Sequence, residues 1–322
     1  MADYKAIHGK NILSLASDLD NAEGEGQIWF NTTSSDFKTI VKVAGTWATG
    51  GTINTNRSAL GGCGLQTAGL IFGGATPPAT GVAESYDGSS WTETGDLTTA
   101  RHQLGGAGTQ TAALGFGGNG AVDIAETFDG SSWTEVGDLT TGRFNAHGVG
   151  TQTAALSIGG ETPTKTGIVE SYNGTAWTEI ADMNTAKSKS GTTSNGTTTA
   201  ALCFSGVTPA SNLAALTESF NGTAWTEVGD LNTGRNDAGG SGTQTYAACF
   251  CGDLAPGITV NTEIWDGTSW TEVNNMATAG YAISGFGTGS AAIAAAGAPS
   301  PARGTASEEW TVSADIETIA FD

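Results

Sequence analysis

Two series of charged residues recur along the chain at a spacing that could bring opposite charges together. The glutamates are Glu84, Glu126, Glu170, Glu218, Glu263 and Glu308, and the cations are Arg57, Arg101, Arg143, Lys187 and Arg235. Such groups could form a ligand site in every repeat, or an ion pair that holds each repeat together. Because an active site usually occurs once, the repetition favours an architectural ion pair. Gly280 stands where the sixth cation is expected, so the sixth glutamate is predicted to lack this partner.

Other residue types with chemical potential are few and scattered. The histidines are His8, His102 and His147, and the cysteines are Cys63, Cys203, Cys249 and Cys251. No histidine recurs with Cys, Asp or Glu at a metal-ligand spacing, and no CxxC, HExxH, GxSxG or P-loop motif occurs. The cysteines are interpreted as small buried hydrophobes. We therefore expect no catalytic residue, no metal site and no cofactor.

The charge balance is strongly acidic. The chain has 12 Lys and Arg against 32 Asp and Glu, for a net charge of −20. This balance opposes binding to nucleic acid or to an anionic membrane, because both attract basic patches. No segment approaches the length of about 20 apolar residues that a membrane-spanning helix needs, and no signal peptide is recognisable at the start. The sequence favours a protein made in a reducing cytoplasm, with no nucleic-acid partner and no membrane insertion.

A sequence repeat organises most of the chain. Its clearest marker is a tryptophan, at Trp47, Trp91, Trp133, Trp177, Trp225 and Trp270, with spacings of 42 to 48 residues. Each repeat contains four short apolar or glycine-rich runs bounded by turn residues, which is the signature of short strands. Asp-Gly or Asn-Gly precedes the tryptophan in five repeats and predicts a tight hairpin between the third and fourth strands. The period predicts a radial all-β fold of four-stranded antiparallel units.

Counting the strands predicts how the ring closes. There are six candidates each for the first, second and third strand, but Trp310 aligns with Tyr86 and not with Trp91. The Trp47 strand, which precedes the first repeat, is therefore predicted to complete the sixth unit. The competing solution uses residues 316–321 as the last strand. The predicted segments are 1–46, with a hairpin from 27–31 and 37–43, then a six-bladed β-propeller over 47–311, then a C-terminal strand or tail over 312–322.

The connections between the second and third strands vary most among the repeats. They lie at 75–81, 119–123, 161–167, 207–215, 253–261 and 298–305. In a four-stranded up-and-down unit, these loops share one face with the joints between successive units. Variation on one face predicts a binding platform, or loops that drift because nothing constrains them. Both interpretations stay open.

The repeat resembles Kelch repeats in three features. These are a Gly-Gly after the second strand, an aromatic residue in the third and the spaced tryptophan of the fourth, as in Gly73-Gly74, Tyr86 and Trp91. The pattern weakens to Ser205-Gly206, Cys251-Gly252 and Ala296-Gly297 in the later repeats. The resemblance implies a Kelch-like propeller closed by an N-terminal strand. It implies little about function, because Kelch propellers include enzymes, actin binders and adaptors.

A second resemblance covers the flanking segments. GQIWFNTTSSDFKTIVKVAGTW at 26–47, INTNR at 53–57 and EEWTVSADIETI at 308–319 resemble the entry and exit of repeat-rich virion proteins of tailed, especially marine, bacteriophages. This resemblance implies a non-enzymatic structural protein of the virion, such as a tail fibre, a tail spike or a head decoration protein. Its implied partners are other virion proteins, with a homo-oligomer as a further possibility. The alternative is a cellular carbohydrate-binding or adhesin-like Kelch propeller.

Residues of the sixth repeat suggest where a receptor could bind. Tyr281, Arg303 and the 253–261 loop, which begins at Asp253, lie on the variable face in the predicted topology. Tyrosine stacks on sugar rings, and Arg and Asp can hydrogen-bond sugar hydroxyls. The hypothesis is that these residues bind a host-surface glycan or protein. The competing account is that the sixth repeat only accommodates closure of the ring.

Overall fold

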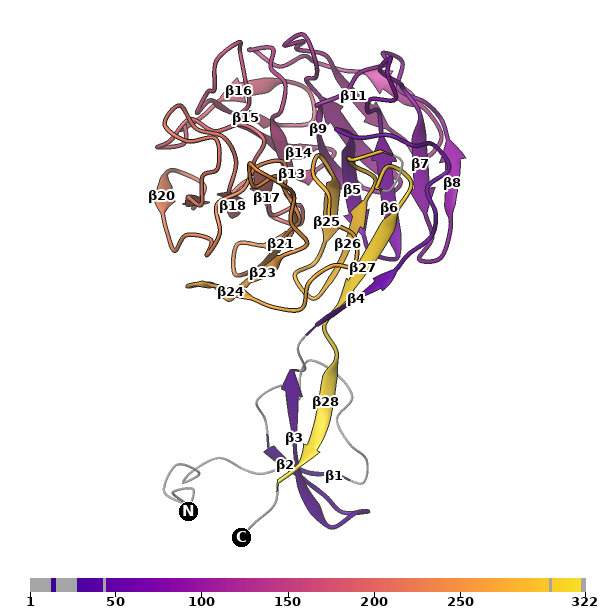
Figure 1. Ribbon diagram of the computed structural model, residues 1–322, viewed down its shortest axis with the longest axis vertical. Coiled ribbons are helices and arrows are strands. Elements are labelled where there is room, and N and C mark those ends of the chain that lie inside the picture. The colour runs from indigo at the N-terminus through magenta and orange to yellow at the C-terminus, as the bar shows by residue number, and fades with distance from the viewer. Residues whose placement is uncertain (1–12, 16–27, 43–44, 301–302, 320–322) are drawn as a thin grey trace. The chain divides into compact units, whose positions relative to one another are not determined.

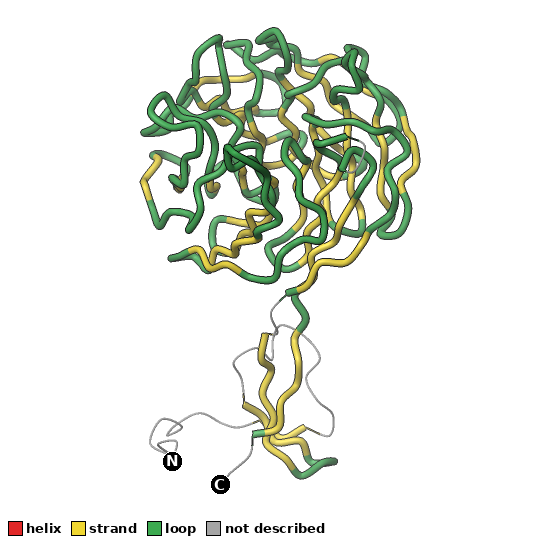
Figure 2. The backbone as a smooth tube through the Cα atoms, in the orientation of Figure 1, coloured by secondary structure: helices red, strands yellow, loops and turns green. Residues whose placement is uncertain are grey.

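Figure 1 shows the computed structural model, which describes residues 13–15, 28–42, 45–300 and 303–319. In these ranges every regular element is a β-strand, and Figure 2 shows the strands joined by loops and turns alone. The all-β class is therefore confirmed. The chain divides into two compact units, Thr46–Thr311 and Met1–Gly45 with Val312–Asp322.

The smaller unit is a mixed four-stranded sheet in the order β1-β2-β3-β28. Its strands are β1 (Leu13–Leu15), β2 (Ile28–Asn31), β3 (Asp36–Lys42) and β28 (Ala314–Thr318). β2 and β3 form an antiparallel hairpin, and the side chain of Asn31 accepts hydrogen bonds from the backbone N–H of Thr33 and Ser34 in the turn. β28 pairs with β3, with Ile316 opposite Ile40. The alternative use of 316–321 as the last strand of the sixth repeat is therefore wrong, because residues 316–318 pair in another sheet and residues 320–321 lie outside the described ranges.

The larger unit contains six four-stranded antiparallel sheets. Sheet 1 is β5 (Gly61–Leu65), β6 (Ala68–Phe72), β7 (Ala83–Tyr86) and β8 (Trp91–Thr94). Sheet 2 is β9 (Gly105–Thr109), β10 (Ala112–Phe116), β11 (Ala125–Phe128) and β12 (Trp133–Glu135). Sheet 3 is β13 (His147–Thr151), β14 (Ala154–Ile158), β15 (Val169–Tyr172) and β16 (Trp177–Glu179).

Sheets 4 to 6 repeat this arrangement with one change of connectivity. Sheet 4 is β17 (Gly191–Thr192), β18 (Ala201–Phe204), β19 (Thr217–Phe220) and β20 (Trp225–Glu227). Sheet 5 is β21 (Gly239–Thr243), β22 (Tyr246–Phe250), β23 (Thr262–Trp265) and β24 (Trp270–Glu272). Sheet 6 is β25 (Ser284–Gly287), β26 (Ala291–Ala295), β27 (Ser307–Thr311) and β4 (Thr46–Thr49). In Figure 1 the first strands lie nearer the centre of this unit, and β8, β16, β20 and β24 lie at its rim.

The predicted use of the Trp47 strand is confirmed. β4 pairs antiparallel with β27, and Trp47 stands opposite Trp310 with ring centroids 5.6 Å apart. Sheet 6 is thus assembled from two segments that are about as far apart in sequence as the unit allows. Its hydrogen bonds remove the open edge that β27 would otherwise present.

Six backbone hydrogen bonds run in a closed cycle through the six sheets. In each joint, just before the first strand, one residue donates its N–H to the carbonyl of the equivalent residue in the preceding sheet. The donors are Ala59, Gln103, Asn145, Lys189, Asp237 and Ala282, with N···O distances from 2.7 to 3.3 Å. Ala59 donates to Ala282, which joins the first sheet to the sixth. All six residues have φ between 49° and 58°, a left-handed conformation that costs about 1 kcal/mol per non-glycine residue.

Glutamines in the turns between first and second strands link neighbouring sheets. Gln110 donates to the carbonyl of Tyr86 at 2.6 Å, and Gln152 donates to that of Phe128 at 2.6 Å. Gln244 bonds Phe220 in the same way, and Gln66 bonds Trp310 at 2.8 Å across the junction of sheets 1 and 6. The glutamine side chain of each of these turns therefore binds the preceding sheet, a contact that the sequence analysis did not predict.

The apolar core lies between successive sheets. The phenylalanine that ends a second strand packs against the tryptophan of the next sheet, as in Phe72–Trp133 at 4.7 Å and Phe116–Trp177 at 5.0 Å between ring centroids. Phe204–Trp270 at 4.8 Å and Phe250–Trp47 at 5.0 Å repeat this contact. All four cysteines are free and buried, as the sequence predicted, and burial raises the pKa of the Cys249 thiol to about 12.

Near the centre, the size of each first-strand residue is matched to its partner on the second strand. A Cβ on Gly105 would lie 2.4 Å from the ring of Phe116, and Gly61, Gly191 and Gly239 meet their own phenylalanines in the same way. Where the partner is smaller, the first residue is larger. His147 pairs with Ile158, and Ser284 pairs with Ala295. The position therefore accepts a side chain only when the opposite ring is absent.

This match predicts a strong coupling in sheet 3. Ile158→Phe should lower the free energy of unfolding by about 1–3 kcal/mol, because the ring would overlap the His147 side chain. His147→Gly should also destabilise the protein, because it removes packed atoms. The double variant recreates the Gly–Phe residue pair found in sheets 1 and 2, so it should be more stable than either single variant. Urea unfolding of the four proteins measures the coupling. Strictly additive effects would contradict this packing.

Candidate functional site

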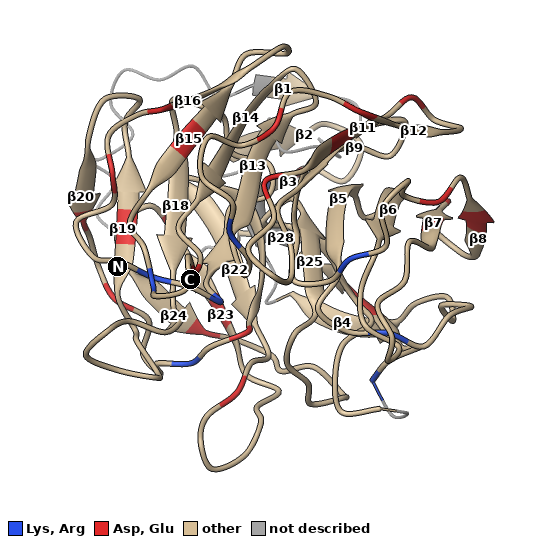
Figure 3. Cartoon of the chain, turned by 90° about the horizontal axis from the view of Figure 1, so that it is seen from above, with Lys and Arg blue, Asp and Glu red and all other residues tan. Residues whose placement is uncertain are grey.

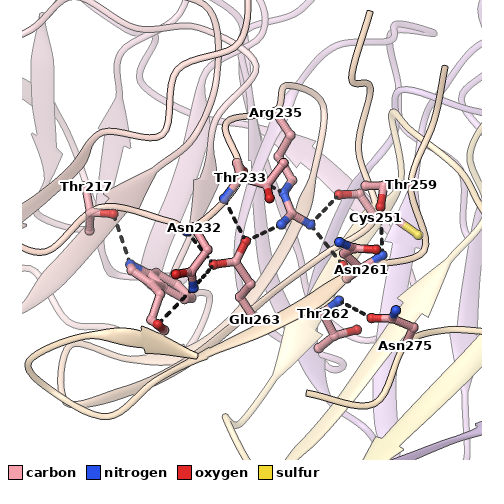
Figure 4. Close-up of polar contacts among 11 residues, drawn as sticks. Thr217, Asn232, Thr233, Arg235, Cys251, Thr259, Asn261, Thr262, Glu263 and Asn275 are labelled. Carbon is pink, nitrogen blue, oxygen red and sulfur yellow. Dashed lines mark hydrogen bonds and ion pairs between the residues drawn. The ribbon is translucent and has the colours of Figure 1, made fainter. Parts of the chain in front are cut away.

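The repeated glutamate and cation meet at the joint that carries the chain from one sheet to the next. In sheet 5, Glu263 Oε2 accepts hydrogen bonds from the backbone and side chain of Asn232, at 2.7 and 2.9 Å. Its Oε1 accepts from Thr233 N–H and pairs with the guanidinium of Arg235 (Figure 4). Arg235 also donates to the carbonyls of Cys251 and Asn261. One carboxylate thus fixes the joint 232–235 onto the third strand.

The same ion pair occurs in all six sheets, so the architectural interpretation is confirmed. The pairs are Arg57–Glu84, Arg101–Glu126, Arg143–Glu170, Lys187–Glu218, Arg235–Glu263 and Arg303–Glu308. Every member is buried. Burial lowers the pKa of Arg57, Arg143 and Arg303, and the attraction of the paired glutamate opposes that shift. The repeated charges therefore hold the sheets and joints together and are almost entirely withdrawn from the surface.

Sheet 6 obtains its cation from an unexpected place. Gly280 lacks a side chain, but Glu308 does not lack a partner, because Arg303 reaches it from the loop before β27 at 3.1 Å. A Cβ on Gly280 would lie 2.8 Å from Cγ of Arg303, so the arginine occupies the space that a residue at 280 would need. The prediction that the sixth glutamate lacks a cation is therefore wrong. The repeat pattern could not reveal this partner, because Arg303 does not occupy the position that the cation holds in the other five sheets.

Of the three predicted binding residues, Arg303 is removed from the surface by this pairing. Its side chain is 0% exposed, so its predicted contact with a receptor is corrected to a structural role. Tyr281 is partly exposed, and its backbone pairs with Ala298 at the start of the sixth variable loop. Asp253 is also partly exposed and pairs through its backbone with Asn236 in sheet 5. Each joint therefore lies beside the variable loop of its own sheet, on one face.

This face is where the otherwise similar repeats diverge. The positions of the hydrogen-bonded cycle have one backbone conformation but different side chains, namely Ala59, Gln103, Asn145, Lys189, Asp237 and Ala282. The residues just before them also differ, namely Ser58, His102, Phe144, Ser188, Asn236 and Tyr281. Because backbone atoms alone make the cycle, these side chains can change without breaking it. The variable position that lies two residues after each repeated cation therefore marks this face in the sequence. The sequence analysis did not use this signal.

A small depression lies at the centre of this face. Its walls include Leu60, Leu104 and Ile283, and its polar side chains include Gln103, Asn145 and Asp237. Asp237 forms an ion pair with Lys189 at 2.8 Å. Burial raises the pKa of Asp237, and Lys189 partly opposes that shift. The depression combines hydrogen-bond donors and acceptors with apolar walls, which suits small polar groups of a ligand.

His147 lines the same depression and the narrow space beneath it. Its Nε2 is buried without a hydrogen-bond partner in the described part of the chain. Burial lowers the pKa of His147 from 6.5 to about 4, because an imidazolium would lose its hydration there. His147 is therefore neutral at pH 7.

Almost all the cationic side chains of the larger unit form ion pairs. Eight of the 12 Lys and Arg lie in residues 46–311, and six of these are in the buried pairs. Only Lys165 and Lys189 remain, and Lys189 is paired with Asp237. Figure 3 accordingly shows acidic segments spread over many strands and few basic ones. Because each buried cation is paired with a buried glutamate, the pairs leave the net charge unchanged, but almost every charge left at the surface of this unit is acidic.

Comparisons with known proteins give no assignment: no family model matches the chain, and no curated protein matches it. Among the described residues, no group of three or more His, Cys, Asp or Glu side chains is placed to hold a metal ion. Within the same ranges, no helix is long and apolar enough to cross a membrane.

The corrected role of Arg303 gives a direct test. Arg303→Ala should lower the free energy of unfolding by about 3–5 kcal/mol, because Glu308 would remain buried without its cation. Adding Gly280→Arg should recover most of this loss, since the space is then free and the other sheets use that position. Denaturant unfolding of both variants measures the effect. A stable Arg303→Ala protein would contradict the assignment.

The lowered pKa of His147 predicts a pH dependence of stability. Above pH 6.5 the histidine is neutral in both folded and unfolded chains, so its contribution is constant. As the pH falls from 6.5 towards 4, the unfolded chain binds a proton that the folded chain does not, and stability is lost. The loss between pH 7.0 and 5.0 should be smaller in His147→Gly/Ile158→Phe, measured by urea unfolding. Equal losses in both proteins would refute this, because all other titrating groups are shared.

Proposed function

We propose that the six sheets are the blades of a closed six-bladed β-propeller of the Kelch type, completed by an N-terminal strand. Support comes from the cycle of six backbone hydrogen bonds, in which Ala59 of sheet 1 donates to Ala282 of sheet 6. Further support is the pairing of β4 with β27, which joins both ends of the unit in one sheet. A ring of this kind is rigid, so its variable face would present side chains in fixed positions.

The protein is, in this proposal, a non-enzymatic structural protein of a tailed-bacteriophage virion, with the variable face binding the host surface. The observation that carries the binding role is the confinement of divergence to one face, while the buried pairs and strands repeat almost unchanged. The virion assignment is supported by the resemblance of segments 26–47 and 308–319 to phage proteins. A tail fibre, tail spike or head decoration protein would fit equally well.

Partners and location follow from the same proposal. Other virion proteins would hold the chain in the particle, through the smaller unit or through contacts between copies, and a host glycan or protein would bind the variable face. The scarcity of unpaired cations in residues 46–311 supports a protein that binds neither nucleic acid nor an anionic membrane. Its location would be the virion, after synthesis in the host cytoplasm.

Adsorption of phage particles tests the binding role. Gln103→Ala/Tyr281→Ala should leave folding intact and lower the adsorption rate at least about tenfold, because a recognition hot spot contributes about 2 kcal/mol or more. Thr92→Ala, on an exposed edge strand, is the matched control and should adsorb normally. Normal adsorption by the double variant would reject the binding face. Mass spectrometry of purified particles tests the location, and a chain found on cells and absent from particles would favour the cellular carbohydrate-binding alternative.

A further inference from the structure

Sheet 6 lacks side chains that the other sheets place around the buried glutamate. In sheet 5, the carboxamide of Asn232 donates to Glu263 Oε2 and to the carbonyl of Trp270, both at 2.9 Å (Figure 4). Asn54 makes the same two contacts in sheet 1. In sheet 2 a hydroxyl replaces the carboxamide, and Thr98 Oγ1 donates to Glu126 Oε2 at 2.8 Å. Sheet 6 has Ala277 at this position, which has nothing to donate.

A second side chain is shortened nearby. In sheets 1 to 5, an Asp or Asn after the fourth strand accepts a hydrogen bond from the first residue of the third strand. These acceptors are Asp96, Asp138, Asp182, Asp230 and Asn275, at 3.1 to 3.3 Å. Thr52 holds this position in sheet 6, and Gly50 and Gly51 precede it. Both differences remove side-chain atoms from the same neighbourhood of the sheet.

A cavity of about 250 Å³ lies where these side chains are missing. Its lining includes Thr49, Thr52, Ala277, Thr278, Thr305 and Glu308. Glu308 is 3% exposed, so its carboxylate is a buried polar group in the wall. Since one water occupies about 30 Å³ of liquid, the space holds several waters or one small organic molecule.

The hydrogen bonds of Glu308 indicate what the cavity would accept. Its Oε1 accepts from Thr278 N–H at 3.0 Å and from Arg303 at 3.1 Å. Within the described ranges, its Oε2 accepts one hydrogen bond, from Ala277 N–H at 2.8 Å. Sheets 1, 2 and 5 add a neutral side-chain donor to the equivalent oxygen. Because Arg303 already balances the charge of Glu308, a neutral donor fits here better than a second cation.

We propose that this cavity binds a neutral sugar, with one pyranose hydroxyl donating to Glu308 Oε2 in place of the missing Asn or Thr side chain. The hydroxyls of Thr49, Thr52 and Thr305 can donate to or accept from the other hydroxyls of the ring. The cavity is lined by the joint residues 277–278 and by Thr305 at the end of the sixth variable loop, which are segments of the proposed binding face. The choice of a sugar rests on the proposed host-binding function and names the ligand class for it.

Restoring the missing side chain tests the cavity. Ala277→Asn places in sheet 6 the group that occupies the site in sheet 5. Thr140→Asn introduces the same residue at the equivalent position of sheet 3 and is the matched control. Binding of D-glucose, D-galactose and D-mannose to the purified full chain is measured by saturation-transfer NMR and calorimetry. At least one sugar should bind the unaltered protein, Ala277→Asn should weaken it at least about tenfold, and Thr140→Asn should not. Thr52→Asp narrows the opposite wall and should have the same effect as Ala277→Asn.

Three outcomes would overturn the proposal. The first is that none of the three sugars binds, and the second is that the control weakens binding as much as Ala277→Asn does. The third is that calcium chloride titrates a site that Ala277→Asn removes, which would make the cavity a cation site. Circular dichroism and unfolding midpoints establish that each variant is folded. Because the assay uses isolated protein, sugar binding by a chain absent from virions would reject the proposed location and keep this inference.

Discussion

The buried ion pair between a third-strand glutamate and a cation is the interaction on which the larger unit depends. Each sheet is joined to the next by an irregular segment whose N–H groups would be unsatisfied without a local acceptor. The glutamate supplies that acceptor, as Glu263 does for Asn232 and Thr233, and the cation offsets the cost of burying its charge. Neither member can be lost alone. This explains why the pair survives in sheet 6 even though its arginine comes from a different segment.

Packing at the centre follows a second constraint of the same kind. The first strands converge there, so a side chain on a first strand fits only where its partner on the second strand is small. The pairs Gly105–Phe116, His147–Ile158 and Ser284–Ala295 satisfy this volume limit in three different ways. The adjoining cycle of hydrogen bonds uses backbone atoms alone. The first-strand side chains are therefore tightly constrained by packing, whereas the side chains of the cycle, a few residues earlier in the chain, can vary. The variable side chains lie on a single face.

Sheet 6 departs from the other five because its strands come from both ends of the unit. Its fourth strand, β4, precedes the repeats and has Trp-Ala-Thr in place of their Trp-Thr-Glu, with Thr52 in place of the following Asp or Asn. The joint contributes Ala277 where Asn or Thr stands elsewhere, and a cavity results. The sheet whose strands come from both ends of the unit is thus also the one with a cavity beside a buried carboxylate.

The sequence by itself determined the all-β class, the period, the hairpin turns, the ion pair in five sheets and the use of the Trp47 strand. These features depend on residue types that recur in register, so they can be found by comparing the chain with itself. Only the tertiary structure decided that Arg303 is buried against Glu308, that residues 314–318 pair with β3, and that glutamine side chains link neighbouring sheets. The first two contacts involve residues that have no equivalent in the other repeats or lie outside the repeats, so comparing the chain with itself cannot reveal them. The glutamines do recur in register, but their partners are backbone carbonyls, which any residue carries and which leave no mark in the sequence.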